Sequence, residues 1–172
     1  ELMNSVYSGA VATDLLKPIG YYKYWLAQDL GRAITQLILR GIPLILAYSL
    51  FYPISFPRSP IQWFWLGISM MLALLVSFSY RFLVNLSSFW VQNAVGIGRM
   101  GFFAPLFLSG FILPLRFMPE WFAQICWLTP FPHMVTTVVD VYLGLLEGTE
   151  LYLALGFQCF WFVVLYLTCQ VI

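Results

Sequence analysis

The sequence predicts an all-α protein that crosses a membrane several times. Hydrophobic residues make up 62% of the chain and charged residues only 9%, whereas a soluble domain carries about 25% charged residues. Several apolar stretches reach the roughly 20 residues that a helix needs to cross the hydrocarbon core of a bilayer. A segment rich in proline and aromatic residues interrupts this pattern. The expected fold is a polytopic helical membrane protein with about four transmembrane helices, a cytoplasmic amphipathic helix and outer re-entrant helices.

Four stretches are expected to form the transmembrane helices, at about 33–56, 61–85, 90–113 and 151–172. Residues 33–113 therefore hold three of the four. The second is the clearest, because it is uncharged as far as Tyr80 and carries Trp63 near its start, and aromatic residues favour the membrane interfaces. In the first, Pro43 removes a backbone donor, which membrane helices tolerate when neighbours satisfy the freed carbonyl.

The segment before the first predicted span has a different composition. Residues 1–32 mix charged and apolar side chains. Val11, Leu15 and Leu16 lie at helical spacing and give the segment one apolar face. Pro18 disfavours a helical conformation at the residue before it, so this helix is expected to end there. The segment is therefore interpreted as an amphipathic segment at the membrane surface.

Residues 114–148 are rich in tryptophan and phenylalanine and also contain Pro114, Pro119, Pro130 and Pro132. Proline prevents one long helix here, while the aromatic side chains still require an apolar or interfacial setting. Short re-entrant or interfacial helices meet both demands, provided that protein covers their backbone. One is expected at 119–129, with Pro119 at its first position and Glu120 at its positive N-terminal end. Another is expected within 133–146.

The distribution of lysine and arginine predicts the orientation of the chain. Basic residues gather before the first predicted span and around the turn between the second and third, namely Lys17, Lys23, Arg32, Arg81 and Arg99. By the positive-inside rule, both of these regions are expected in the cytoplasm. The loop at residues 57–60 and the segment at 114–148 are then expected on the outer side.

Residues 96–101, GIGRMG, match the glycine pattern of a dinucleotide-binding turn. That turn requires a strand before it and an amphipathic helix after it, whereas the residues that follow are almost wholly apolar and interrupted by prolines. We interpret the small residues instead as a site of close helix packing, with Ala94 and Gly98 forming a small-xxx-small pair. The chain contains no Walker sequence and so no P-loop of its own.

The composition also argues against several classes of binding protein. Eight basic residues spread along a chain of net charge +1 make no nucleic-acid-binding patch. Three cysteines and one histidine show no spacing typical of metal ligands. No metal and no cofactor are therefore expected in this chain.

Two short motifs, taken in order, resemble those of a transporter family. Near the N-terminus, Gly9 is followed by Leu16, Lys17 and Pro18. A later segment, LSGFILPLRFMPEWFAQICWLTPFPHM, holds the spaced residues Ser109, Gly110, Pro114, Pro119, Trp121, Pro130 and Phe131. This arrangement is similar to that of permease subunits of ABC-2 type exporters, in the branch described as ABC-2 family transporter proteins. The resemblance extends over nearly the whole chain.

The resemblance implies a membrane-spanning permease subunit that forms the substrate path of an ATP-driven exporter, in a bacterial inner membrane. It implies that this chain is not itself an enzyme, and that ATP and Mg bind to a separate cytoplasmic ABC ATPase. It implies a dimer with a second permease copy or a related permease. It also implies six spans in the whole protein, of which the first two would precede this fragment.

Three groups of residues are candidates for site roles under this resemblance. Residues 1–32 would be a cytoplasmic coupling segment, and its docking face for the ATPase would comprise Asp14, Leu15, Leu16, Lys17 and Pro18. The outer re-entrant gate would comprise Ser109, Gly110, Pro114, Pro119, Trp121, Trp127, Pro130 and Phe131. The substrate path or a helix interface would include Gln36, Arg40 and Gly98. The alternative for Asp14 and Lys17 is that they are solvated surface charges without a docking role.

The residues alone leave other interpretations open. A structural or assembly membrane protein without transport activity is the alternative function, and an intramembrane enzyme is disfavoured because no nucleophile–base pair is evident. Arg40 either snorkels to the cytoplasmic interface or faces the path, since a charge at the bilayer centre costs at least about 2.5 to 3.5 kcal/mol. His133 is either an interfacial histidine satisfied by hydrogen bonds or a pH sensor. Glu120 and Asp140 are expected to face water.

Overall fold

The fold is given by a computed structural model that describes residues 2–7, 9, 11–53, 56–57, 59–91 and 95–171. This part of the chain is largely helical and contains no strand, which confirms the all-α prediction. The chain divides into two compact units, one formed by Ala10–Phe56 and the other by Glu1–Gly9 together with Pro57–Ile172. Each unit is described by itself.

The unit Ala10–Phe56 contains one long helix. After the short helix α2 (Val11–Leu15), the elements α3 (Tyr21–Gln36), η1 (Leu37–Gly41) and α4 (Ile42–Ser49) follow without a break. Together they form a helix of 29 residues that is long and apolar enough to cross a membrane. This helix begins at Tyr21 and ends at Ser49, whereas the sequence predicted a span at 33–56.

The early start of this helix has a local cause in its polar side chains. Gln28 Nε2 donates a hydrogen bond of 2.6 Å to the Tyr24 hydroxyl, and Arg32 donates one of 3.3 Å to Gln28 Oε1. The Lys17 ammonium lies 3.8 Å from the centre of the Tyr24 ring. Side chains four residues apart share a helix face, so these groups satisfy one another along α3. The polar residues that predicted a surface segment therefore lie largely within the first turns of the spanning helix.

The middle of the same helix is widened into a π-helical turn, η1, directly before Pro43. The Ile42 N–H donates to the carbonyl of Leu37, five residues earlier. Proline has no N–H and its ring clashes with the carbonyl four residues before it, so the wider turn accommodates Pro43. The helix therefore continues through Pro43 by means of a π-helical turn, and Arg40 lies within this turn.

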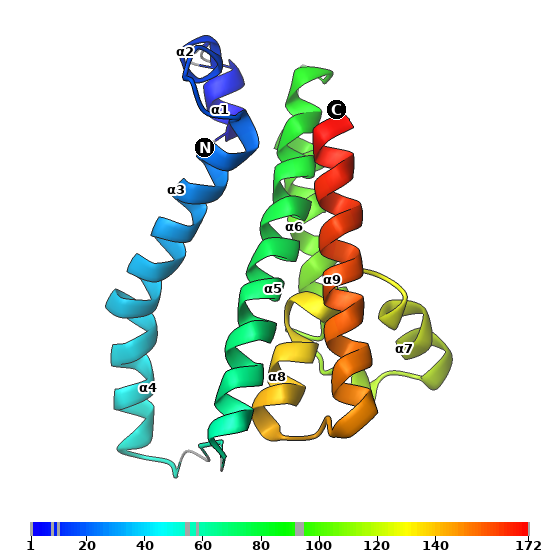
Figure 1. The fold of residues 1–172 in the computed structure, drawn as a ribbon. Helices are drawn as coiled ribbons and strands as arrows, with labels where there is room; N and C mark the ends of the chain where they lie inside the picture. The colour runs from blue at the N-terminus through cyan, green and yellow to red at the C-terminus, as the bar shows by residue number, and fades with distance from the viewer. Residues whose placement is uncertain are drawn as a thin grey trace. The chain divides into compact units, whose positions relative to one another are not determined.

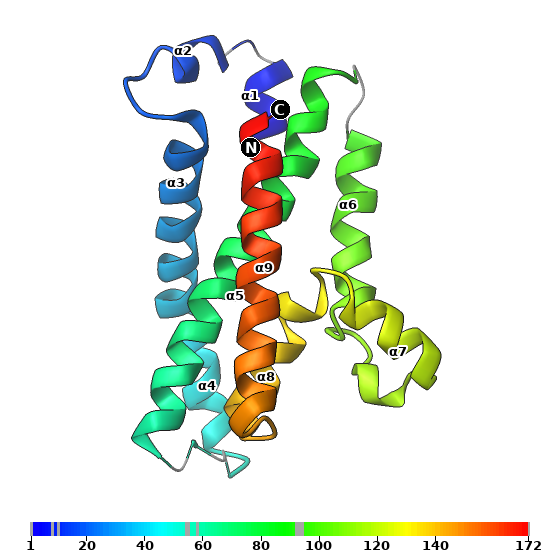
Figure 2. The same cartoon turned by 45° about the vertical axis from the view of Figure 1, so that its right-hand side comes forward.

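The other unit is built on two long parallel helices, α5 (Pro60–Leu86) and α9 (Gly148–Val171), which Figures 1 and 2 show side by side. Ser59 caps α5 by accepting a hydrogen bond from Gln62 N–H, and Pro60 occupies the first turn. The Trp65 ring meets Tyr152, and nearer the other end Cys169 Sγ donates to the carbonyl of Ser79. Both helices therefore start at the same end of the unit.

Two short elements complete the opposite end. Helix α5 continues into the 3-10 turn η2 (Ser87–Phe89), and α1 (Leu2–Tyr7) packs against η2 and α5. With this turn included, Pro60–Phe89 is long and apolar enough to cross a membrane, and so is Gly148–Val171. Among the described residues, three helices meet these criteria, one fewer than predicted.

The difference concerns the third span, predicted at 90–113. Within the described residues its helix, α6, runs from Val95 to Leu108, which is 14 residues. At 1.5 Å per residue this described helix is about 21 Å long, shorter than a hydrocarbon core of about 30 Å. The apolar residues after it are not helical, because Gly110 turns the chain with a φ of 79°. The GIGRMG sequence lies entirely within α6, so the strand-to-helix turn of a nucleotide site is not formed there.

Helix α6 packs closely on α5 at Gly101. A Cβ atom at this position would lie 2.5 Å from Val84 Cγ1, so Gly101→Ala should destabilise the unit by about 1–3 kcal/mol, the usual cost of overpacking. Thermal unfolding of the purified chain in detergent measures this. Gly96→Ala is the matched control, because a Cβ at Gly96 would have none of the described atoms within 4 Å. Val84→Ala should rescue Gly101→Ala, and equal melting temperatures for Gly101→Ala and Gly96→Ala would contradict the packing.

Residues 109–147, which we term the re-entrant segment, connect α6 to α9 through four short elements. In order they are η3 (Leu115–Phe117), α7 (Glu120–Trp127), η4 (Pro132–Met134) and α8 (Thr136–Leu143). The short helices predicted within 119–129 and 133–146 are thus present as α7 and α8. Pro119 precedes α7 as its cap residue instead of starting it. Elements η4 and α8 pack against both α5 and α9.

Candidate functional site

The tip of the re-entrant segment is held at mid-depth between the two long helices. Gln158 Nε2 donates to the carbonyl of His133 at 2.8 Å and to that of Ser69 at 3.3 Å, while the Ser69 hydroxyl donates to Gln158 Oε1 at 3.1 Å. Ser69 and Gln158 lie about 14–15 Å along α5 and α9 from their starts. The tip is therefore held well along both long helices and not at their ends.

His133 is fully enclosed at this tip. Its Nε2 lies 3.2 Å from the carbonyl oxygen of Trp127 and its Nδ1 lies 3.2 Å from Thr137 Oγ1. Since a carbonyl only accepts, Nε2 carries the proton and the Thr137 hydroxyl donates to Nδ1. The imidazole also stacks on Phe157 with an interplanar angle of 6°. The prediction of a histidine satisfied by hydrogen bonds is therefore confirmed, and its side chain is buried within the protein.

Burial lowers the pKa of His133 below its usual value, and the hydrogen bond with the Trp127 backbone opposes this only in part. The folded protein then binds fewer protons at His133 than the unfolded chain. The contribution of neutral His133 to the free energy of unfolding is therefore fully present above about pH 6.5 and is lost as the pH drops toward the folded pKa. We expect a lower melting temperature at about pH 5.5 than at about pH 7.5.

His133 is the single histidine of the chain, which gives this pH dependence a clear control. His133→Gln should flatten the melting temperature between the two pH values. Asp140 acts with the opposite sign, because its raised pKa stabilises the fold as the pH falls through the range just above 3.8. If the melting temperature of His133→Gln still changes equally between the two pH values, another group causes the pH dependence.

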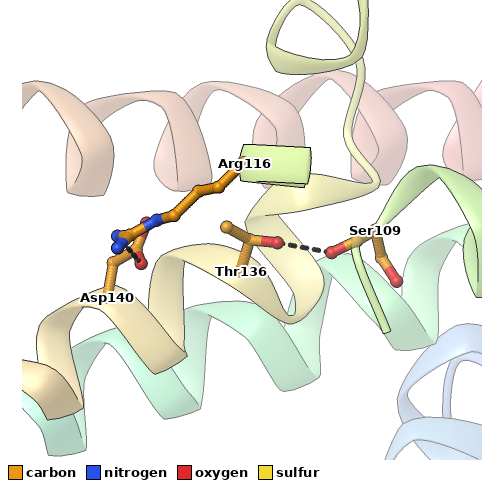
Figure 3. Close-up of polar contacts among 4 residues, drawn as sticks. All are labelled: Ser109, Arg116, Thr136 and Asp140. Atoms are coloured by element: carbon orange, nitrogen blue, oxygen red, sulfur yellow. Dashed lines mark hydrogen bonds and ion pairs between the residues drawn. The ribbon is translucent and has the colours of Figure 1, made fainter. Parts of the chain in front are cut away.

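Two further contacts close the re-entrant segment on itself (Figure 3). The Thr136 hydroxyl donates a hydrogen bond of 2.6 Å to the carbonyl of Ser109, which joins the start of α8 to the end of α6. Arg116 donates to Asp140 Oδ1 at 2.7 Å, which joins η3 to α8. Gly110 is required beside the first contact, because a Cβ there would lie 2.5 Å from Thr136 Oγ1.

The prediction that Asp140 faces water is wrong. Asp140 is only 6% exposed, and burial raises the pKa of its carboxyl while the charge and hydrogen bond of Arg116 lower it. A buried carboxylate requires a partner, which Arg116 supplies from a position far from Asp140 in the sequence. Glu120, in contrast, is exposed in the first turn of α7, as predicted.

The end of the segment that follows η4 is fastened to the start of α5. Gln62 Nε2 donates to the carbonyls of Val141 and Tyr142, at 3.2 and 2.8 Å. These carbonyls belong to the last turn of α8, which Gly144 terminates with a left-handed conformation. The chain therefore returns to the Pro60 end of the unit before α9 begins, which agrees with the predicted placement of residues 57–60 and of the end of segment 114–148 on one side.

A groove lies between α5, α6 and the tip of the re-entrant segment. Its volume is about 300 Å³. The lining residues are Ser77, Tyr80, Arg81, Gly101, Phe102, Pro105, Leu106, Ser109, Phe111, Met134 and Val135. The Tyr80 hydroxyl donates to the carbonyl of Gly101 at 3.1 Å, and the Tyr80 ring meets Phe131 edge to face. The groove is apolar over most of its length and has one cationic side chain, Arg81.

The structure brings together some of the predicted gate residues. Ser109 is buried against Thr136, Trp127 contacts the His133 ring, Phe131 contacts Tyr80, and Gly110 turns the chain beside them. The other gate residues are Pro114, Pro119 and Trp121, which are exposed, and Pro130, which is half-buried. Pro114 and Pro119 cap η3 and α7, so their role in the fold is to start these short elements.

The predicted docking and path residues fall in several places. Asp14 and Leu15 end α2, and their side chains lie outside the described part of the structure. Leu16 and Pro18 are exposed in the turn that follows, whereas Lys17 is half-buried over Tyr24. Among the path residues, Gln36 and Arg40 are exposed on the long helix of their unit, and Gly98 is half-buried in α6. Ala94, the predicted partner of Gly98, lies outside the described residues.

The sequence pattern did not predict which residues anchor the re-entrant segment. Gln158 is an amide in the middle of an otherwise apolar span, and a polar group at that depth normally has a buried partner. This signal was available in the sequence. Ser69 and Thr136 carried no comparable signal, because hydroxyl side chains also occur in membrane helices bonded to their own backbone.

Comparison with known proteins adds the decisive observation. Residues 1–172 match the family described as ABC-2 family transporter protein. The chain belongs to this family. Searches of curated proteins and of solved structures found no match. The resemblance inferred from the spaced motifs is therefore confirmed over the whole chain, and the structure is that of an ABC-2 family membrane domain with spanning helices, a multi-pass integral membrane protein.

Proposed function

We propose that this ABC-2 family protein is the permease subunit of an ATP-driven exporter, which forms the substrate path and docks a separate cytoplasmic ABC ATPase. The observation that carries this proposal is the family match over residues 1–172. The absence of a Walker sequence agrees with ATP and Mg binding in the partner. A second copy, or a related permease, would complete the path in a bacterial inner membrane.

The segment around Leu16 is the proposed docking face. Leu16 is 84% exposed, which is unfavourable for a leucine in water unless a partner covers it. The adjacent Lys17 is held over Tyr24, and hydrogen bonds continue from Tyr24 through Gln28 to Arg32. A displacement of the docking segment would therefore be transmitted to the spanning helix as a rigid-body motion.

The re-entrant segment is the proposed outer gate. Its tip is tied to α5 and α9 by the bonds of Gln158 and its base is tied to α5 by Gln62. These bonds couple the segment to both long helices, so that a change in their spacing would move it. The groove beside Arg81 and Ser109 is the apolar surface that such a motion would open or close.

Affinity purification from membranes tests the proposed function. Tagged permease should retain an ABC ATPase in a gentle detergent, and the complex should hydrolyse ATP. The chain alone should hydrolyse none. Purification of the intact permease without any ATPase would favour the alternative, a structural or assembly membrane protein without transport activity.

The predicted orientation is tested by labelling. Single cysteines replacing Lys23 and Glu120, both exposed, should react from opposite sides of the membrane, because the positive-inside rule puts Lys23 in the cytoplasm. The background lacks the native cysteines, Cys126, Cys159 and Cys169. An impermeant reagent added to intact cells should label only the cysteine at 120. Labelling of both positions from one side would contradict the orientation.

A further inference from the structure

The groove between α5 and α6 has one polar end and an apolar body. At the polar end, Arg81 Nε donates to the carbonyl of Ser77 at 3.2 Å, which directs the guanidinium along the surface of α5. Arg81 is exposed and its guanidinium is permanently charged, with five N–H donors. Away from it, the walls are apolar side chains of α6 and of the re-entrant segment, namely Phe102, Pro105, Leu106, Phe111, Met134 and Val135.

The position of Arg81 along α5 matches the level of lipid headgroups. Arg81 lies five residues before Leu86, the last residue of α5, which is about 7.5 Å of helix. The apolar part of the groove extends from there along α6 as far as Ser109, roughly 12 Å beyond Gly101. The cation is thus near the end of the spanning helix, and the apolar walls run from it toward the middle of the membrane.

We propose that this groove binds a membrane lipid with an anionic headgroup, with the phosphate at Arg81 and one acyl chain along α6. Basic pockets between membrane helices bind the headgroups of anionic lipids on the cytoplasmic side, and the predicted orientation puts this end of α5 there. A volume of about 300 Å³ is at the lower limit of ligand pockets, which suits one chain. The inference goes beyond the proposed export function and does not depend on it.

The shape of the groove favours a lipid over a soluble anion. Phe111 is 67% exposed at its rim and Phe102 is exposed as well, so the groove opens sideways through apolar side chains. A soluble phosphate would make no favourable contact with these apolar walls. An acyl chain enters the groove directly from the bilayer, so it leaves no water behind, and it fills the space between the helices. Arg81 provides the charge that distinguishes anionic from zwitterionic lipid.

Photo-crosslinking tests the site. The full chain is reconstituted in phosphatidylcholine vesicles that contain a small fraction of phosphatidylglycerol with a photoreactive group in its acyl chain, and labelled peptides are mapped. Adducts are expected on the groove walls at Phe102, Leu106 or Phe111, at a yield about five-fold or more above that of the matching phosphatidylcholine probe. A five-fold difference corresponds to about 1 kcal/mol in binding free energy. Equal labelling by the two probes would overturn the proposal.

Matched variants assign the labelling to the groove. Arg81→Gln should lower phosphatidylglycerol labelling to the phosphatidylcholine level, and Arg81→Lys should retain most of it. Arg99→Gln removes an exposed charge of α6 outside the groove lining and should leave the yield unchanged. Equal loss in Arg81→Gln and Arg99→Gln would reduce the effect to general surface charge and contradict a specific site.

Two further arms keep the test decisive. Leu106→Trp fills the groove and should reduce labelling by both lipid probes, so persistence of the adducts in this variant would overturn the proposal even if Arg81→Gln fails to fold. Millimolar inorganic phosphate should not displace the lipid probe. Complete displacement by phosphate would show a simple anion site in place of a lipid site.

Discussion

Replacing Leu16 by aspartate is expected to remove the ATPase from the purified permease while the permease stays inserted. Leu16 is 84% exposed, so the substitution disturbs no internal packing of the chain. In the proposed complex the new carboxylate would be buried in a pocket shaped for an apolar side chain, at a cost of several kcal/mol if it remains unpaired. A penalty of about 2.7 kcal/mol lowers affinity about 100-fold.

The control is Leu50→Asp. Leu50 is 82% exposed and follows the last residue of the same spanning helix, so the substitution makes the same chemical change at the other end of that helix. Co-purification of the ATPase, quantified by gel densitometry, should be lost in Leu16→Asp and retained in Leu50→Asp. Retention of the ATPase and of export in Leu16→Asp would exclude the docking role.

Gln158→Leu is expected to release the re-entrant segment and abolish export without affecting ATPase binding. The substitution removes the amide that donates to the carbonyls of His133 and Ser69 and accepts from the Ser69 hydroxyl. Each buried polar group left without a partner costs about 1–3 kcal/mol, and Gln158 is 0% exposed, so water does not replace the lost bonds. We therefore expect a large fall in the melting temperature and in hydrogen-exchange protection of η4.

Gln170→Leu is the matched control, because Gln170 lies on the same helix and is exposed. It should leave both stability and export close to those of the unchanged protein. Ser69→Ala combined with Gln158→Leu should cost less than the sum of the two single changes, since the two side chains form one network. Additive effects, or protection of η4 that survives Gln158→Leu, would show that other contacts hold the segment.

The sequence predicted the long apolar helices well and their boundaries approximately. Helix α5 covers Pro60–Leu86 against a prediction of 61–85, and α9 covers Gly148–Val171 against 151–172. These elements follow from uncharged runs of sufficient length, which is a local property. The short helices α7 and α8 also followed from local evidence, because prolines and aromatic residues limited what the segment could form.

The features that failed depend on contacts between distant residues. The chain leaves α6 at Leu108 although apolar residues continue, because Gly110 and the bond from Thr136 to Ser109 turn it there. Asp140 was expected in water, since nothing in its local sequence indicated that Arg116 would accompany it into the protein. Such pairings arise only when the segment folds back on itself.

The polar start of the first long helix concerns a helix boundary only, and its cytoplasmic position stays a prediction. Its mixture of charged and apolar residues predicted a separate surface segment, whereas contacts four residues apart along α3 satisfy the polar groups of Tyr24, Gln28 and Arg32 and the helix continues into the apolar residues. An amphipathic pattern does not by itself distinguish a surface helix from the interfacial turns of a spanning helix. The boundary between the two therefore could not be placed from composition.

The central claim, that the segment around Leu16 docks an ABC ATPase, is tested most directly by crosslinking in intact membranes. A photoreactive amino acid is placed at Leu16, and another at Phe117, which is exposed on the re-entrant segment. The account predicts a covalent adduct with the ATPase from position 16 and none from position 117. No adduct from position 16 in membranes that contain the ATPase, or equal adducts from the two positions, would contradict it.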